Sequence, residues 1–334
     1  MKGKVRVLVI RFSSIGDVVL TTPVLRHLEE QLDGEVEIHY LTKKSMAPLL
    51  ENNPRIHTLH TIEKTTSEVM PVLKEIPIDY VIDLHNNARS GFVKRGLKML
   101  DFTLNKRNWQ KWVLVNFGMN KLPPGEHIVD RYLDTLNAFN FQKDHKGLEY
   151  YLPEAIDVKG IPSEPYMVFV LGATHEGKLI ATKQWYTLAE NTGKHPIVLI
   201  GGKEETDIAI AIKEKYPEMI DFTGKTSLNE SAYIIQQSAC VISGDTGFMH
   251  IASAFNKPIL SIWGCTSPAL QMSPYLPNEN NLILEPIGLS KRPCSKLGNR
   301  CKYGKGETRC ITRITPEQLQ QSITLLRERV FSVL

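Results

Sequence analysis

Long apolar stretches are absent from this sequence of 334 residues. No run approaches the roughly 20 residues that a membrane-spanning helix requires. The apolar run at residues 5–10 is too short and too soon interrupted for a secretion signal, and no small-residue cleavage site follows it. These two absences predict a cytoplasmic protein, which could still touch a membrane surface.

A large excess of one charge and a disulfide framework are absent as well. Forty Lys and Arg residues against 36 Asp and Glu leave a formal net charge of +4. So small a charge predicts no nucleic-acid partner, although local basic clusters could face another anionic partner. Five cysteines form an odd set that does not suit a disulfide framework in a chain of this size.

The familiar nucleotide-binding fingerprints are missing too. Neither G-x-G-x-x-G nor G-x-x-x-x-G-K-[ST] occurs, so the sequence carries neither a dinucleotide fingerprint nor a P-loop. What the sequence does contain is an alternation of short apolar runs with amphipathic segments of helix length. With 42% hydrophobic and 23% charged residues, this is the composition of an ordinary globular protein.

The apolar runs predict strands of parallel sheets. Several are nearly continuous in Val, Ile and Leu, as in strands that helices cover on both faces. The predicted strands are residues 5–12, 36–42, 56–62, 80–85, 167–172, 197–201, 220–223, 240–243 and 259–263. Their alternation with helical segments predicts an α/β fold with doubly wound sheets.

A Pro-rich break at residues 151–165 interrupts the alternation and predicts a linker. We therefore expect two domains, residues 1–160 and residues 161–315, each large enough to bury its own core. Residues 316–334 form a final helix that begins with Pro in its first turn. Open α/β sheets bind ligands at the carboxyl ends of their strands, so two such halves imply a cleft.

The first predicted strand ends in a turn that places Asp17 at the start of a helix. One interpretation makes Asp17 a helix cap or first-turn acid, which the helix dipole favours. The other makes it a general base at the edge of the cleft, on the domain that binds the substrate whose hydroxyl it deprotonates.

A second strand–turn–helix lies at residues 241–254. Gly247, the Thr246 hydroxyl and the N–H groups at the helix start would cradle a diphosphate. A plain tight connection could use the same glycines, but Asp245 and His250 exceed what a turn needs.

Three further polar residues follow predicted strands of the second half. Thr174 lies just beyond the first of these strands. Lys183 could neutralise a leaving phosphate, although a lone lysine is more often a solvated surface residue. Glu204 could accept a ribose hydroxyl, or it could be an ordinary acid in a helix first turn.

Five segments together resemble one known family. They are residues 11–17 (RFSSIGD), 83–86 (DLHN), 183–185 (KQW), 244–250 (GDTGFMH) and 264–268 (GCTSP). In this order they resemble glycosyltransferase family nine, the lipopolysaccharide heptosyltransferases, over nearly the whole chain. The resemblance implies a GT-B fold, in which an N-terminal acceptor domain and a C-terminal donor domain face a central cleft. It also implies that the final helix, residues 316–334, crosses back to pack on the N-terminal domain.

The implied reaction is an inverting, metal-independent transfer of heptose, or a related sugar, from ADP-heptose to the inner core of lipopolysaccharide. No cofactor is expected beyond the ADP-sugar substrate, because lysine, helix N–H groups and hydroxyls can stabilise the departing diphosphate in place of a cation. The resemblance makes Asp17 the base. The residues it implies for the donor and its diphosphate are Lys183, Asp245, Thr246, Gly247 and His250, to which Thr174 and Glu204 are added from their positions.

On the acceptor side the sequence departs from the family, which commonly has Asp-x-Gln-Gly at residues 83–86. This departure leaves the acceptor's identity open. The predicted acceptor-binding residues are Ser14, Gly16, His85, Arg89 and Arg131. Arg131 could pair with an acceptor carboxylate, but a structural Arg–Asp pair on a helix would explain it equally well.

The middle of the first half is basic and partly aromatic. The residues concerned are Arg89, Lys94, Arg95, Lys98, Lys106, Arg107 and Lys111, with Trp109 and Trp112. A solvated helix face is the ordinary explanation. The alternative is a docking surface for an anionic glycolipid, with peripheral contact to the cytoplasmic face of the inner membrane.

Three of the cysteines, Cys294, Cys301 and Cys310, cluster in a basic loop at residues 291–313. They contain no C-x₂-C pair and no fourth ligand is evident, so we expect structural packing and no metal site, with zinc as the alternative. Two rival functions remain for the whole chain. One is a nucleotide-sugar epimerase of the same architecture, and the other is a non-catalytic nucleotide-sugar-binding protein.

Overall fold

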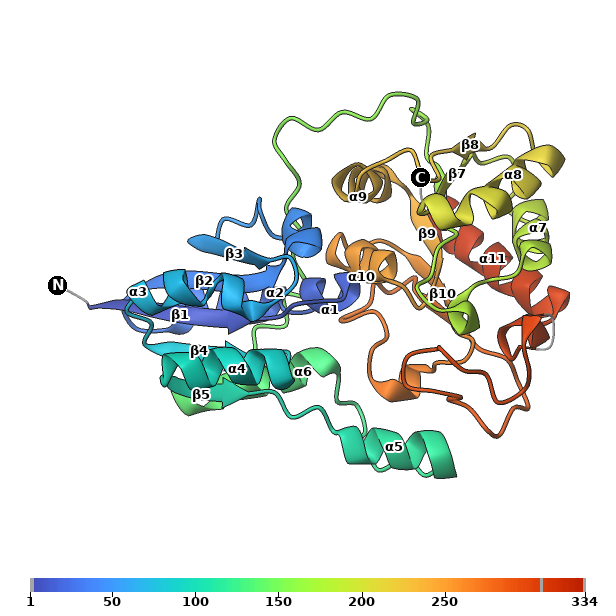
Figure 1. Cartoon of the computed structure of the whole chain (residues 1–334). Coiled ribbons are helices and arrows are strands. Elements are labelled where there is room, and N and C mark those ends of the chain that lie inside the picture. Colours follow the sequence, from blue (N-terminus) through green and yellow to red (C-terminus); the bar gives the residue numbers. More distant parts are fainter. Residues whose placement is uncertain (1–2, 307–308, 333–334) are drawn as a thin grey trace. The chain divides into compact units, whose positions relative to one another are not determined.

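The computed structural model describes residues 3–306 and 309–332. Its contacts divide the chain into two units (Figure 1). The first unit comprises Met1–Lys106 and Glu126–Pro153, and the second comprises Arg107–Gly125 and Glu154–Leu334. The break after Pro153 falls inside the predicted linker, where the described residues 151–165 form no helix or strand.

The first unit is a parallel five-stranded sheet in the order β3-β2-β1-β4-β5. Its strands are β1 (Lys4–Ile10), β2 (Glu35–Lys43), β3 (Thr58–Ile62), β4 (Tyr80–Asp83) and β5 (Leu100–Thr103). Its α-helices are α1 (Ile15–Val19), α2 (Thr22–Gln31), α3 (Met70–Glu75), α4 (Ala88–Leu97) and α6 (Ile128–Leu133). Chain order reverses between β1 and β4, since β2 and β3 lie on one side of β1 and β4 and β5 on the other.

Both faces of this sheet are buried, which explains why β1 ends in four consecutive apolar residues, 7–10. Leu8 and Ile10 pack on one face against Leu73 of α3 and Val93 of α4. Because side chains alternate along a strand, Val7 and Val9 point to the opposite face, and they are equally buried. Such a strand stays parallel and central, with a helix layer over each face.

The second unit is a parallel six-stranded sheet in the order β11-β10-β9-β6-β7-β8. Its strands are β6 (Met167–Val170), β7 (Ile197–Ile200), β8 (Ile220–Asp221), β9 (Cys240–Gly244), β10 (Ile259–Ile262) and β11 (Leu282–Leu284). Its α-helices are α5 (Asn108–Phe117), α7 (Thr182–Glu190), α8 (Thr206–Lys215), α9 (Leu228–Gln237), α10 (Gly247–Ala254) and α11 (Pro316–Phe331). Here the chain order reverses between β6 and β9.

The final helix corrects one expectation. We predicted that residues 316–334 pack back on the N-terminal domain; residues 333–334 lie outside the described residues. Instead, α11 buries Leu319, Ile323 and Leu326 in the core of the second unit, beside Trp185 of α7. Its apolar positions recur every three to four residues, so one face needs a hydrophobic partner, and the sheet of its own unit supplies it.

Two other features differ from the predicted domain plan of 1–160 and 161–315. The strands β5 and β11 were not predicted; they lie at sheet edges and are only four and three residues long. Residues 107–125 group with the second unit because Leu114 and Leu122 pack against Leu270. The nine predicted strands all form, with ends within a few residues of those expected.

Candidate functional site

Each unit has one point where chain order reverses, and the predicted site residues follow the strands at these points. In the first unit, Asp17 follows β1 and His85 follows β4. In the second unit, Thr174 follows β6 and Asp245 follows β9. The loops leaving two such strands diverge to opposite faces of the sheet, which opens a crevice at their carboxyl ends where ligands bind.

In the first unit the carboxylate of Asp17 is held from two sides. Arg11 Nη2 lies 2.6 Å from Asp17 Oδ1, and Ser14 donates to Oδ2 from its hydroxyl at 2.7 Å and from its backbone N–H at 3.2 Å. The side chain is 20% exposed, so it remains accessible to a ligand. Asp17 therefore caps its own helix, as the first interpretation of the sequence expected, and its carboxylate is also paired with a guanidinium.

Arg11 is a residue whose role was not predicted. It stands at the end of β1, is buried, and donates from Nη1 to the carbonyl of Leu84 at 2.6 Å. Its guanidinium thus joins the segment after β4 to Asp17 across the point of reversal. A basic residue directly after an apolar strand was the available signal.

His85 lies in the first unit beside the carboxylate turn, which is the segment of residues 11–17 that holds Asp17. Its ring meets that of Phe12 edge-on, with centroids 5.1 Å apart. Burial, together with the positive charges of Arg11 and Lys106, lowers the pKa of His85 to about 4. The imidazole is therefore neutral at pH 7 and can exchange a hydrogen bond with a polar ligand.

The other predicted acceptor residues lie in three different settings. Ser14 is exposed and Gly16 is buried in α1, both within the carboxylate turn. Arg89 is exposed in the first turn of α4. Arg131 is buried, with its Nε 3.5 Å from Glu126 and its Nη1 donating to the Lys106 carbonyl at 3.2 Å. Arg131 thus has a carboxylate partner, which is Glu126 rather than an aspartate of its own helix.

In the second unit the turn after β9 pairs an acid with a lysine. Asp245 is nearly buried, and its Oδ2 lies 2.7 Å from Lys178 Nζ. Thr246 caps α10 by accepting from the N–H of Met249 at 3.4 Å and bonds with the Ser243 hydroxyl at 3.0 Å. Gly247 is the first residue of α10, and His250 is buried one turn further on. Lys178 was missed because nothing in its sequence context separates it from a surface lysine.

The remaining predicted donor residues are exposed around the same sheet edge. Thr174 lies in the loop after β6, and Lys183 lies in the first turn of α7. Glu204 is exposed, whereas its neighbour Glu205 is buried and accepts from the Gly202 N–H at 2.8 Å. Glu205 thus closes the turn after β7, and Glu204 is the acid left facing solvent.

Comparisons with known proteins identify the family of the chain. The model of glycosyltransferase family 9 (heptosyltransferase) matches residues 69–302. The chain belongs to glycosyltransferase family 9. It is 23% identical to lipooligosaccharide heptosyltransferase 2 of Haemophilus influenzae, over 96% of this chain and 99% of that protein.

Solved structures agree on the fold of this glycosyltransferase. A family 9 glycosyltransferase from Veillonella parvula gives a TM-score of 0.76 at 21% identity, with 97% of each chain covered. The Escherichia coli heptosyltransferase WaaC, solved with ADP, gives 0.70 at 18% identity, with 96% and 99% covered. The two Rossmann-like units thus form the GT-B fold, as the resemblance implied.

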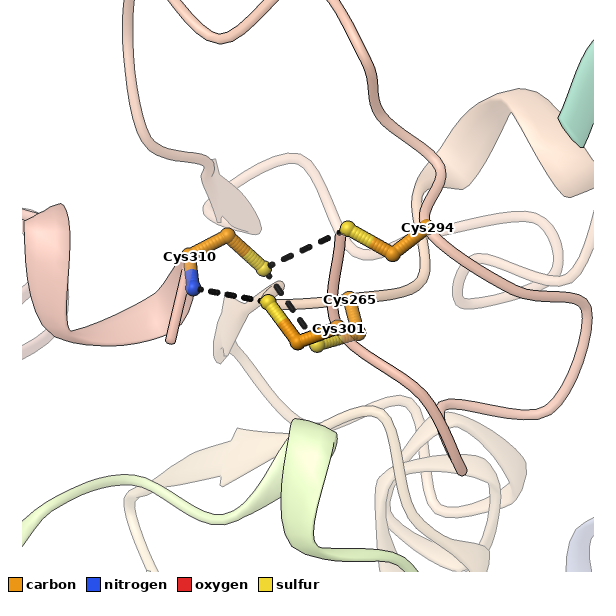
Figure 2. A group of neighbouring side chains, drawn as sticks. All are labelled: Cys265, Cys294, Cys301 and Cys310. Carbon is orange, nitrogen blue, oxygen red and sulfur yellow. Dashed lines mark hydrogen bonds between the residues drawn. The ribbon is translucent and has the colours of Figure 1, made fainter. Parts of the chain in front are cut away.

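Four of the five cysteines, all in the second unit, lie together in space. Cys265, directly after β10, lies among the three cysteines of the basic loop, and Figure 2 shows the four sulfurs turned toward one another. All four sulfurs lie within 4.8 Å of one another. A fourth thiol, Cys265, thus joins the three of the basic loop, close in space and remote in sequence.

One pocket of the second unit lies away from the predicted residues. It has a volume of about 780 Å³ and is lined by residues 161–166, 237–239 and 255–258, among others. These segments precede β6, β9 and β10, so the pocket sits at the amino ends of the strands. Over residues 3–306 and 309–332, no helix has the length and hydropathy that crossing a membrane requires.

Proposed function

We propose that this family 9 glycosyltransferase moves heptose from ADP-heptose to the inner core of lipopolysaccharide, with inversion at the anomeric carbon. The names of its relatives, which include a lipooligosaccharide heptosyltransferase and a heptosyltransferase solved with ADP, support this donor and this acceptor class. One observation carries the proposal. In the first unit the carboxylate of Asp17 is fixed directly after β1. In the second unit the turn after β9 has a capped helix start and the ion pair of Lys178 with Asp245.

In the proposed reaction an acceptor hydroxyl attacks the anomeric carbon as the bond from that carbon to the diphosphate oxygen breaks. The hydroxyl proton passes to Asp17, and ADP leaves with the bonding electron pair. Attack on the face opposite the leaving group inverts the configuration. Arg11 and Ser14 hold Asp17 ionised and oriented for this transfer, which is what a general base requires.

The second unit would bind the donor and stabilise the leaving diphosphate. The N–H groups at the start of α10 attract an anion, and the exposed ammonium of Lys183 adds a positive charge at the same sheet edge. Lys178 neutralises Asp245, which would otherwise repel the diphosphate. Because these groups supply the electrostatic stabilisation, we propose a transfer step without a metal ion and without a cofactor.

The decisive experiment replaces the proposed base with an isosteric amide. We expect Asp17→Asn to lower kcat by about 10²–10⁴-fold, because general base catalysis contributes about that much. Transfer would be measured with ADP-heptose and an inner-core glycolipid, and ADP binding by calorimetry. ADP binding should stay unchanged, since Asp17 belongs to the other unit.

The matched control is His85→Gln, which removes the other proton acceptor near the same turn. It should weaken acceptor binding, seen as a raised KM, and leave kcat within about tenfold. If His85→Gln abolished transfer and Asp17→Asn did not, His85 would be the base. If both variants kept full turnover, the carboxylate turn would have no part in the reaction.

Titration with ADP, UDP, GDP and their sugars tests the donor class. We expect ADP and ADP-heptose to bind most tightly. Incubation with donor alone separates the transferase from the epimerase, because only an epimerase would convert the sugar without an acceptor. The family assignment favours the transferase.

We also propose peripheral contact with an anionic membrane surface, through the exposed aromatic side chains of α5. Trp109, Trp112 and Phe117 are each more than half exposed. Of the basic residues once grouped with them, Lys94 pairs with Asp101 at 2.8 Å and Lys111 is buried, so only part of that cluster could face lipid. After centrifugation with anionic vesicles, the wild type should be in the vesicle pellet, and a Trp109→Ser, Trp112→Ser double variant should be in the supernatant.

A further inference from the structure

The four sulfurs of Cys265, Cys294, Cys301 and Cys310 have the spacing of a metal-binding tetrahedron. The Cys310 sulfur lies 3.3 Å from that of Cys265 and 3.9 Å from that of Cys294 (Figure 2). A Zn–S bond of about 2.3 Å places the sulfurs of a tetrahedral site ~3.8 Å apart. The observed separations scatter around this value, and all four cysteines are free thiols rather than disulfides.

The surroundings also suit thiolate ligands. The Cys310 N–H donates to the Cys301 sulfur at 3.3 Å, the kind of hydrogen bond that orients a metal ligand. The loop of residues 285–310 has seven Lys and Arg residues against two Glu, so its positive charge offsets that of a tetrathiolate. Lys302 lies close by and donates to the Pro293 carbonyl, beside Cys294, at 3.2 Å.

This loop also needs a means of holding its shape. Between β11 and the 3₁₀ turn Ile311–Arg313, its described residues 285–306 and 309–310 contain no α-helix or β-strand. Loops this long without secondary structure are uncommon in compact domains. Three of the four cysteines come from this loop and the fourth from the end of β10, so one ion would tie the loop to the sheet.

We propose that Cys265, Cys294, Cys301 and Cys310 bind a single metal ion of the kind that four thiolates favour, with zinc as the expected ion. Tetrahedral four-sulfur sites suit zinc or iron, and zinc is redox-inert. With four protein ligands, the ion has no open position for a substrate. Its role is therefore structural.

The site would fix a segment next to the donor turn, which is the turn of residues 245–247 after β9. The Cys265 N–H donates to the Gly177 carbonyl at 2.9 Å, and the Gly177 N–H donates to the Gly298 carbonyl at 3.1 Å. A Cβ on Gly177 would lie 2.5 Å from the Cys265 sulfur, so the segment packs directly on the cluster. The next residue, Lys178, holds Asp245. This second role rests on the proposed function.

The test measures metal content in the full chain, purified without chelators, by elemental analysis and native mass spectrometry. We expect about one equivalent of zinc per chain in the wild type and loss of the metal in Cys301→Ala. The matched control is Cys240→Ala, which removes a buried thiol of β9 outside the cluster and should keep the metal. Cys301→His, which can still ligate, should retain it as well.

Iron in place of zinc would support the same site with the other ion. If Cys301→Ala fails to fold, cobalt added to demetallated wild type decides the question, through the visible and near-ultraviolet absorption of a tetrahedral thiolate site. Two disulfides, or four thiols that take up neither zinc nor cobalt under reducing conditions, would overturn the proposal. Loss of ADP affinity on demetallation tests the second role separately, since metal content is measured without nucleotide.

Discussion

The turns that follow β1 and β9 have a similar strand–turn–helix backbone, but they differ in the charge at the start of the helix. In the first unit, Asp17 occupies the start of its own helix by accepting from the Ser14 N–H, and Arg11 balances its charge. In the second unit, the acid Asp245 stands before the helix, and the cap is the neutral hydroxyl of Thr246. A helix start that already holds a carboxylate repels another anion, whereas one capped by a hydroxyl still attracts it. The difference suits a proton acceptor in one unit and a diphosphate in the other.

After the loss expected for Asp17→Asn, the largest effect should come from removing the positive charge proposed to face the diphosphate. Lys183→Met should lower kcat/KM by about 10²–10³-fold, the usual cost of losing one stabilising group for a developing negative charge. Lys183 lies in the first turn of α7, at the carboxyl edge of β6, which neighbours β9. Steady-state kinetics with ADP-heptose would measure the change.

The control for this variant is Lys194→Met. Lys194 is also exposed, but it precedes β7 and so lies toward the amino ends of the strands. It should leave kcat/KM unchanged. Equal losses of kcat/KM in both variants would indicate a general charge effect. Full activity of Lys183→Met would show that another cation near the donor turn stabilises the diphosphate.

The sequence predicts the strands and turns of the two units better than the side-chain contacts of those turns. Continuous apolar strands can be recognised locally, and so can a polar turn before a helix, which is how Asp17 and Thr246 were found. The partners of these turns, Arg11 and Lys178, depend on which loops meet at a sheet edge, and that is a property of the tertiary structure. Cys265 was missed as a fourth member of the cysteine cluster for the same reason, because its neighbours in space are remote in sequence.

The same reasoning explains why α11 was placed on the wrong domain. Its periodicity shows that one face is apolar, but two sheets were available to receive that face. The choice depends on complementary packing with Trp185 and its neighbours, which no local pattern records.

The next largest effect is a loss of folding stability at acid pH, which should be greater in the first unit than in the second. Burial lowers the pKa of His60 and of His85 to about 4, and it lowers the pKa of His39 as well, all in the first unit. The unfolded chain binds more protons than the folded one between pH 6.5 and about 4, so stability falls as the pH drops through this window. The loss should be about 1–3 kcal/mol for each of His60 and His85. In the second unit, burial also lowers the pKa of His195, so the contrast is one of degree.

Tryptophan fluorescence makes this contrast measurable. All four tryptophans, Trp109, Trp112, Trp185 and Trp263, belong to the second unit. In urea at pH 5, the far-ultraviolet circular dichroism should therefore begin to change at lower urea than the fluorescence, and the two should lie closer together at pH 7.5. His60→Gln should narrow the gap at pH 5. Coincident transitions at both pH values would show that the units unfold together.

The smallest effect distinguishes the two helix starts directly. Thr246→Ala removes an accepting hydroxyl from α10 and should cost about 1 kcal/mol of unfolding free energy. Ser14→Ala removes a hydroxyl that donates to Asp17 rather than capping the helix, so its stability cost should be smaller and its effect on kcat larger. Urea unfolding and steady-state kinetics on both variants measure the two effects, with Thr246→Ser as the variant that keeps the cap. If Ser14→Ala were the more destabilising of the two and left kcat unchanged, the two turns would share one structural role, and the carboxylate at Asp17 would be a cap alone.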